Sequence, residues 1–179
     1  MCRGHKHSYE RCISPLYYDN ELKNAIFQLK THGYRQVVDS LAGEMAEVIR
    51  REYGGIAFDV IVPIPLHKSA YAERGFNQAE LLACSLSTYV HLPTKLVLKK
   101  LYATKPQKTL TMQQRSGNLL GAFDVIDAAS VEGATVLLVD DVVTTGSTLD
   151  ECAKMLKLHG AKEVYAVTAA AARRDNDDG

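Results

Sequence analysis

The residues best suited to chemistry lie in one stretch, 136–148, which reads VLLVDDVVTTGST. An apolar run is followed by two carboxylates, Asp140 and Asp141, and by a turn rich in hydroxyl groups that leads into a helix predicted to begin near Ser147. The start of a helix offers unpaired N–H groups and partial positive charge, which favour a phosphate group, and Gly146 would let the backbone approach it closely. Because carboxylates accept hydrogen bonds from sugar hydroxyls, this stretch indicates a sugar-phosphate site.

Plainer interpretations of the same residues remain open. Ser147 and Asp150 have the spacing of a capping box, which any helix can use. Two aspartates after a strand can also simply end that strand in solvent. The Walker A pattern GxxxxGK[ST] is absent, so this is not predicted to be the phosphate loop of a P-loop nucleotide-binding protein.

The thirteen residues 136–148 resemble the signature of type I phosphoribosyltransferases that binds 5-phosphoribosyl-1-pyrophosphate (PRPP), and they match it at every position. The resemblance implies that the chain binds PRPP together with Mg2+, the ion being held mainly through PRPP oxygens near the two aspartates. The residues that it implies as PRPP ligands in this stretch are Asp140, Asp141, Val143, Thr144, Thr145, Gly146, Ser147 and Thr148.

Two further segments, VPIPLHKSAYAERGFNQAELLA at 62–83 and TLTMQQRSGNLLGAFDV at 109–125, look like the ComF family of late competence proteins. With the signature, the resemblance covers roughly residues 15–170. It implies a pyrophosphate loop at 66–69 and a flexible lid at about 103–117. The residues concerned are Leu66, His67, Lys68 and Arg74 in or beside the loop, and Lys105, Lys108 and Arg115 in the lid, with Lys105 and Arg115 assigned to catalysis beside Asp140 and Asp141.

Residue chemistry alone supports these loop assignments weakly. Lys68 or Arg74 taken singly would more often be a solvated side chain. Asn77 is also a suitable N-cap, so the residues before it could be no more than the entry to a helix.

The N-terminal residues depart from the ComF pattern, in which many members carry a zinc ribbon with two CxxC pairs. This chain has neither pair, and only Cys2, His5, His7 and Cys12 could serve as soft or borderline ligands. Their spacing is not a standard one for zinc, so Zn2+ is not expected here. We predict instead that residues 1–35 form a reduced hood, a remnant of the ribbon, over the active site.

Hydrophobic periodicity predicts the elements that must position these residues. Helices are expected at 21–30, 35–53, 77–89 and 147–158, and strands at 57–63, 94–98, 122–126, 135–139 and 163–168. Strands that alternate with helices predict an α/β fold with a mostly parallel sheet covered on both faces, in which ligands bind at the carboxyl ends of the strands. This agrees with the type I phosphoribosyltransferase fold. We place its core at 36–172 and a charged, flexible tail at 173–179.

Composition excludes several other classes of protein. A length of 179 residues, 46% of them hydrophobic, and a net charge of zero are typical of one globular domain. The longest apolar run is too short to span a bilayer, and no secretory signal is recognisable, so we expect a cytoplasmic protein without membrane insertion. Cys84 and Cys152 fall in helical patterns and are expected to be buried free thiols.

The charge is unevenly distributed despite its zero sum. No acidic residue lies between Glu80 and Asp124, whereas six basic residues do: Lys95, Lys99, Lys100, Lys105, Lys108 and Arg115. A lid that binds pyrophosphate and a surface for single-stranded DNA explain this stretch equally well. Three functions therefore stay open: a phosphoribosyltransferase of unknown acceptor, a PRPP- and single-stranded-DNA-binding competence protein, and a base-salvage enzyme. A homodimer is also allowed.

Overall fold

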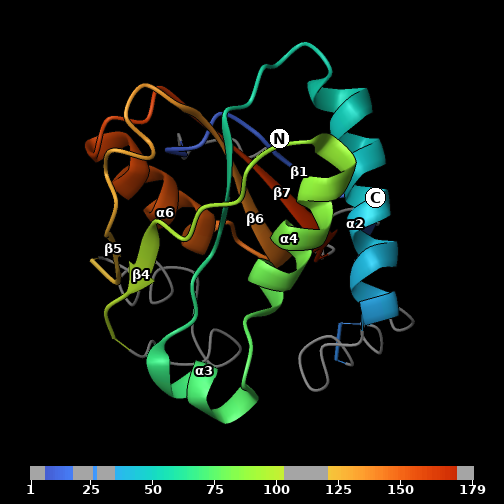
Figure 1. Cartoon of the computed structure of the whole chain (residues 1–179), viewed down its shortest axis with the longest axis horizontal. Helices are drawn as coiled ribbons and strands as arrows, with labels where there is room; N and C mark the ends of the chain where they lie inside the picture. Colours follow the sequence, from blue (N-terminus) through green and yellow to red (C-terminus); the bar gives the residue numbers. More distant parts are fainter. Residues whose placement is uncertain (1–6, 18–25, 28–34, 103–120, 173–179) are drawn as a thin grey trace, which may run out of the picture.

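The computed structural model describes residues 7–17, 26–27, 35–102 and 121–172, and a parallel sheet lies at its centre (Figure 1). The strand order is β1-β7-β6-β3, and β2 adds to the edge of β7 beyond β1, also in parallel. The long central strands are β6 (Thr135–Val143) and β7 (Glu163–Ala171), flanked by β3 (Val60–Pro63), β1 (Cys12–Ile13) and β2 (Leu16–Tyr17).

Alternate residues of β6 point to opposite sides of the sheet. Because the side chains on both sides are apolar, helices cover both faces. Leu137 and Val139 belong to one core cluster with α2 (Arg35–Tyr53) and α4 (Gln78–Val90). Val136 and Leu138 belong to the other cluster, with α6 (Ser147–Leu158). All four β6 side chains are fully buried, which contributes about 1.5–3 kcal/mol each. Figure 1 shows α2 and α4 on one side of the strands and α6 on the other.

Two smaller elements lie at the carboxyl end of the sheet. The short helix α3 (Lys68–Arg74) follows β3 directly. The strands β4 (Leu98–Lys100) and β5 (Phe123–Val125) form a separate antiparallel pair, with Lys99 opposite Asp124. Strand β5 packs against α6, the helix that follows the stretch singled out by the sequence, and Figure 1 shows α3 beyond the end of β3.

The predicted α/β architecture is confirmed, with differences at particular elements. Helix α6 has the expected bounds, and Asn77 caps α4 through a hydrogen bond that Ala79 N donates to its Oδ1 (3.0 Å). The sequence did not predict α3, β1 or β2, which have at most seven residues and so little room for a periodic pattern. The helix expected at 21–30 falls almost entirely outside the described residues.

Several expectations are wrong in detail. The strand expected at 94–98 is found instead at Leu98–Lys100 (β4), and Thr94 makes only an isolated bridge to Ile61. Strand β6 does not end at Val139 but continues to Val143, because Asp140 and Val142 still pair with β7. Cys152 is buried as expected, whereas Cys84 is exposed, on the outer face of α4. Among the described helices, none is long and apolar enough to cross a membrane. The hood boundary at residue 35 stays a prediction, although residues 12–17 already join the central sheet.

Candidate functional site

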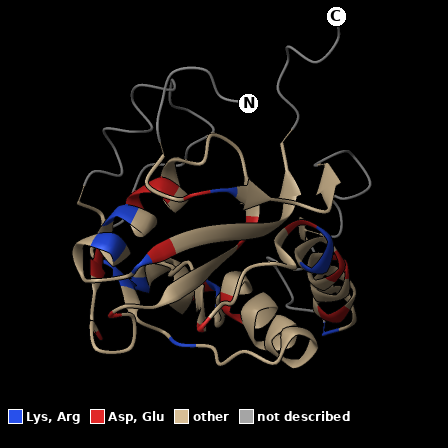
Figure 2. Cartoon of the chain, turned by 90° about the horizontal axis from the view of Figure 1, so that it is seen from above, with Lys and Arg blue, Asp and Glu red and all other residues tan. Residues whose placement is uncertain are grey.

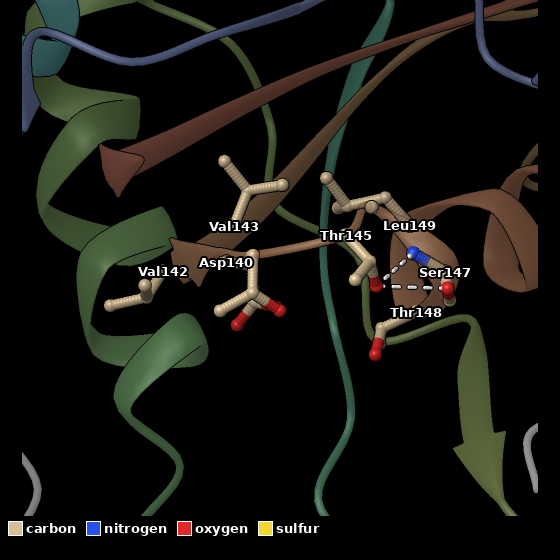
Figure 3. Close-up of a pocket in the computed structure, with 9 residues that line it drawn as sticks. Asp140, Val142, Val143, Thr145, Ser147, Thr148 and Leu149 are labelled. Carbon is tan, nitrogen blue, oxygen red and sulfur yellow. Dashed lines mark hydrogen bonds between the residues drawn. The ribbon is translucent and has the colours of Figure 1, made fainter. Parts of the chain in front are cut away.

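The stretch after β6 folds into a tight turn that opens a helix. Gly146 adopts the left-handed conformation (φ +80°, ψ 0°) and is the N-cap of α6, whose first turn closes with Asp150 N donating to Gly146 O (2.8 Å). Most non-glycine residues avoid this conformation. A pocket lies in the turn, and Figure 3 shows the residues around it: Asp140 and the run 142–149.

Hydroxyl groups and helix N–H groups surround this pocket. Thr145 Oγ1 and Ser147 Oγ are 2.9 Å apart, and Ser147 N donates a long hydrogen bond to Thr145 Oγ1 (3.4 Å; Figure 3). The N–H groups in the first turn of a helix have no carbonyl partner within the helix, so they remain available to an anion. The geometry therefore suits a phosphate group bound by backbone and hydroxyl donors.

The alternative of a plain capping box is wrong for this helix. The N-cap is Gly146 and no side chain caps the helix. The carboxylate of Asp150 instead accepts a hydrogen bond from Ser8 N, and Asp150 Oδ1 lies 3.7 Å from His7 Nδ1. In a capping box, the Asp150 side chain would bond to the start of its own helix. Here it contacts Ser8 and His7 instead.

The two aspartates at the end of β6 occupy different environments. Asp140 lines the pocket, and its carboxylate points to the same side as the Thr148 hydroxyl in Figure 3. Asp141 is only 5% exposed and does not line the pocket, because the next residue of a strand points to the opposite face. Asp141 N donates to Asp140 Oδ1 (2.8 Å), which helps to fix the Asp140 carboxylate.

Lys100 is a site residue that sequence reasoning missed. It ends β4, and its ammonium lies 5.4 Å from the centre of the Phe123 ring. Burial lowers the pKa of Lys100, while the nearby charge of Asp140 acts in the opposite direction. The place of Lys100 near the pocket aspartate is visible only once the β4–β5 pair is folded against α6. The sequence signal was its place in the acid-free stretch.

A second, larger cavity lies between α3 and β4. Its volume is about 600 Å³, within the range of small-molecule sites, and three lysines join apolar side chains in its lining. Of the expected pyrophosphate-loop residues, it brings together Leu66 and Lys68. The full lining is Pro65, Leu66, Lys68, Tyr71, Ala72, Leu98, Lys99, Lys100 and Leu101.

The other two expected loop residues have local partners instead. His67 is the N-cap of α3 and accepts a hydrogen bond from Ser69 N (3.3 Å). Arg74 Nη1 donates to Gln78 Oε1 (3.0 Å), which joins the end of α3 to the start of α4. Neither residue lines the two cavities described above, and their roles in binding stay predictions.

Cys12 is poorly suited to a metal site. It lies in β1, and burial together with the nearby Asp140 charge raises the pKa of its thiol to about 12. Because zinc binds the thiolate, this environment disfavours coordination. Within the described residues no group of three or more His, Cys, Asp or Glu side chains is placed to hold a metal ion. Cys2 and His5 lie outside those residues.

The acid-free stretch forms no uninterrupted basic surface where it is described. Lys99 Nζ lies 3.3 Å from Asp124 Oδ2, and Lys100 is half-buried beside Phe123. Figure 2 shows basic and acidic positions interspersed over the elements that it colours. Lys105, Lys108 and Arg115 lie outside the described residues, so their places in the site remain predictions.

Comparison with known proteins adds independent findings. The phosphoribosyl transferase domain model matches residues 34–178. The chain is 34% identical over 160 residues to the DNA utilization protein YhgH of Escherichia coli K12, covering 87% of this chain and 70% of that protein. It is 37% identical over 108 residues to competence protein F of Haemophilus influenzae (59% and 47%) and 32% identical over 139 residues to ComFC of Bacillus subtilis (78% and 55%). The matches thus span about half the length of the last two relatives.

The chain also resembles solved structures at low sequence identity. Adenine phosphoribosyltransferase from Saccharomyces cerevisiae has a TM-score of 0.48 at 14% identity, over 81% of this chain and 72% of that one. Glutamine PRPP amidotransferase from B. subtilis has a TM-score of 0.47 at 19% identity, over 73% and 26%.

Proposed function

Since the chain belongs to the ComF/YhgH family of phosphoribosyltransferase-domain proteins, we propose that it binds PRPP with Mg2+ and transfers the phosphoribosyl group to an acceptor, releasing pyrophosphate. The observation that carries this proposal is the pocket after β6, where one carboxylate, several hydroxyls and the start of α6 meet. We assign the 5'-phosphate to the turn formed by Thr144, Thr145, Gly146, Ser147 and Thr148, with Val143 at its entry.

Asp140 and Asp141 would then have different roles at the ribose. Asp140 faces the pocket, so its carboxylate is placed to accept hydrogen bonds from the ribose hydroxyls. Its negative charge would also stabilise positive charge that develops on the ribose ring as pyrophosphate leaves. Asp141, buried behind it, would hold Asp140 through its backbone N–H.

The pyrophosphate group would extend toward the larger cavity between α3 and β4. Lys68, Lys99 and Lys100 line that cavity and supply positive charge for a leaving group that carries several negative charges. Lys105 and Arg115 complete the proposed catalytic set from outside the described residues. In the transfer step, the bond between the anomeric carbon and the pyrophosphate oxygen breaks while the acceptor bonds to that carbon.

The residues of the pocket fit a magnesium ion held mainly by the substrate. Mg2+ takes oxygen ligands, and Asp140 is the aspartate that the pocket exposes to the ligand. One carboxylate does not make a complete protein cage, so PRPP oxygens would supply most of the coordination. Bound there, the ion would neutralise charge on the leaving pyrophosphate. We propose no protein zinc site, since Cys12 is half-buried and desolvation raises the pKa of its thiol.

A second candidate function is non-catalytic: a cytoplasmic protein that binds PRPP and single-stranded DNA in DNA uptake. The names of its relatives, a competence protein and a DNA utilization protein, favour it. The lysines of β4 contribute little to it, because Lys99 pairs with Asp124 and Lys100 is half-buried. Base salvage is a third candidate, for which the described residues supply no aromatic and acidic pocket over the sugar site.

Calorimetric titration of the protein with PRPP, with and without Mg2+, tests the proposal, with Asp140→Asn as the matched control. We expect Mg2+-dependent binding that the control weakens. A screen of bases and amines for pyrophosphate release then separates the candidates. Release with one acceptor supports transfer, whereas PRPP binding without release, together with a gel shift of single-stranded DNA, supports the second function. Absence of PRPP binding would contradict both.

A further inference from the structure

The N-terminal residues 7–10, which we name the N-terminal strap, lie along α6 and are attached to it and to β7. Ser8 N donates to the Asp150 carboxylate in the first turn of α6. Lys157 Nζ donates to Glu10 Oε1 (2.6 Å) near the other end of the helix, and Glu10 N donates to Val164 O in β7 (2.8 Å). These three contacts set the position of the strap against the helix that carries the phosphate turn.

The strap places an aromatic pair against the turn itself. The rings of His7 and Tyr9 are stacked, with centroids 4.6 Å apart and an interplanar angle of 9°. A β-carbon added to Gly146 would lie 2.5 Å from Tyr9 Oη, 3.6 Å from Tyr9 Cζ and 3.8 Å from His7 Cε1. Neither ring lines the pocket, and Tyr9 packs against the core cluster on the α6 side. The rings therefore contact Gly146 without lining the pocket in which we place the phosphate.

From these contacts we infer that Tyr9 is a positioning residue, which braces Gly146 and so holds the phosphate turn in its binding conformation. The inference rests on the proposed function in that PRPP is the ligand of the turn. It also gives Gly146 a role that the sequence did not predict. A side chain there would collide with the phenol of Tyr9, in addition to the strain of φ +80°.

The collision involves one atom, and this makes the inference testable by a double-mutant cycle. Tyr9→Phe removes the hydroxyl that lies 2.5 Å from the added β-carbon and leaves the ring, whose nearest remaining atom is at an ordinary contact distance of 3.6 Å. Gly146→Ala in the wild-type background carries both the collision and the backbone strain. In the Tyr9→Phe background it carries the strain alone.

We expect Gly146→Ala to weaken PRPP binding about 30-fold in the wild-type background and only about 5-fold in the Tyr9→Phe background, with Tyr9→Phe alone within about twofold of wild type. The matched control is Tyr89→Phe, which removes an exposed phenol hydroxyl on α4. Equal losses from Gly146→Ala in both backgrounds would overturn the inference, because the substitution would then act on the ligand or the backbone alone.

Hydrogen exchange of the ligand-free protein separates this inference from the proposed function. Tyr9→Ala should speed exchange of the amides at 144–148 by about tenfold, while exchange in β6 and β7, which reports global stability, stays close to that of Tyr89→Ala. If wild-type protein bound no PRPP, the proposed function would fail, yet this exchange pattern would still support the brace. Unchanged exchange at 144–148 would overturn it.

Discussion

The two halves of the proposed site differ in how they are attached to the protein. The turn after β6 leads into α6, which buries Leu149, Cys152, Ala153 and Leu156 in the core and contacts the N-terminal strap. The loop after β3 leads into α3, which buries none of its residues. The His67 cap and the hydrogen bond from Gly75 N to Tyr71 O (2.7 Å) lie within α3 itself. The helix is joined to α4 by Arg74 Nη1, which donates to Gln78 Oε1 (3.0 Å).

This difference indicates how each half would bind its part of PRPP. A turn fixed by the core presents N–H and hydroxyl groups with little ordering left to be done on binding. The α3 side offers the long side chain of Lys68, which is exposed and retains conformational freedom. We therefore expect substitutions in the turn to affect every ligand with a 5'-phosphate, and substitutions near α3 to affect only ligands with a pyrophosphate.

The largest effect is expected for Gly146→Val. A branched side chain would be strained at φ +80° and would collide with Tyr9, so the turn should lose its binding conformation. PRPP and ribose 5-phosphate should both bind at least about 100-fold more weakly, or about 2.7 kcal/mol, in calorimetry. The domain should stay folded by circular dichroism. Normal binding, or loss of folding without a specific binding defect, would contradict the role of this turn.

Asp140→Asn should have the next largest effect, and Asp141→Asn supplies its matched comparison. Losing the pocket carboxylate should weaken PRPP binding by about 1.5–3 kcal/mol with little change in melting temperature. Asp141 is buried on the face of β6 opposite to the pocket. Its substitution should therefore act more on the melting temperature and less on PRPP binding. The opposite ranking in titration and thermal melting would show that Asp141, not Asp140, contacts the ribose.

The different environments of Asp140 and Asp141 show which features of the site the sequence could predict. The apolar run and the hydroxyl-rich turn predicted β6, α6 and the phosphate turn, because each leaves a local pattern. Which aspartate faces the pocket depends on how far β6 continues, and pairing with β7 decides that. The contacts of Tyr9 with Gly146 and of Ser8 with Asp150 join residues more than 130 positions apart, so no local pattern reports them.

Lys68→Ala tests the half of the proposed site that α3 forms. Because Lys68 lines the larger cavity, its loss should weaken PRPP binding about three- to tenfold and leave ribose 5-phosphate binding unchanged. Glu73→Ala is the control from the same short helix, since Glu73 is exposed and lines neither cavity. Equal losses for both ligands in calorimetry would place Lys68 with the phosphate turn instead.

The smallest effect on PRPP affinity is expected for chemical modification of the cysteines. One of them, Cys152, lies in α6. In a Cys2→Ser background at pH 8, a thiol reagent should modify exposed Cys84 at least about 100-fold faster than Cys12 and Cys152. Burial raises the pKa of all three thiols, and the difference in rate is expected because Cys12 and Cys152 are less accessible than Cys84. Modified Cys84 should leave PRPP affinity unchanged. Rapid reaction of Cys152 would show that α6 opens readily and is not the fixed half.

Hydrogen exchange with bound ligand tests the central claim most directly. Magnesium PRPP added to the wild-type protein should slow exchange most strongly at the amides of 144–148, with weaker protection at 66–70. Ribose 5-phosphate should protect 144–148 alone. If PRPP binds but protects other amides while exchange at 144–148 is unchanged, the turn after β6 is not the phosphate site.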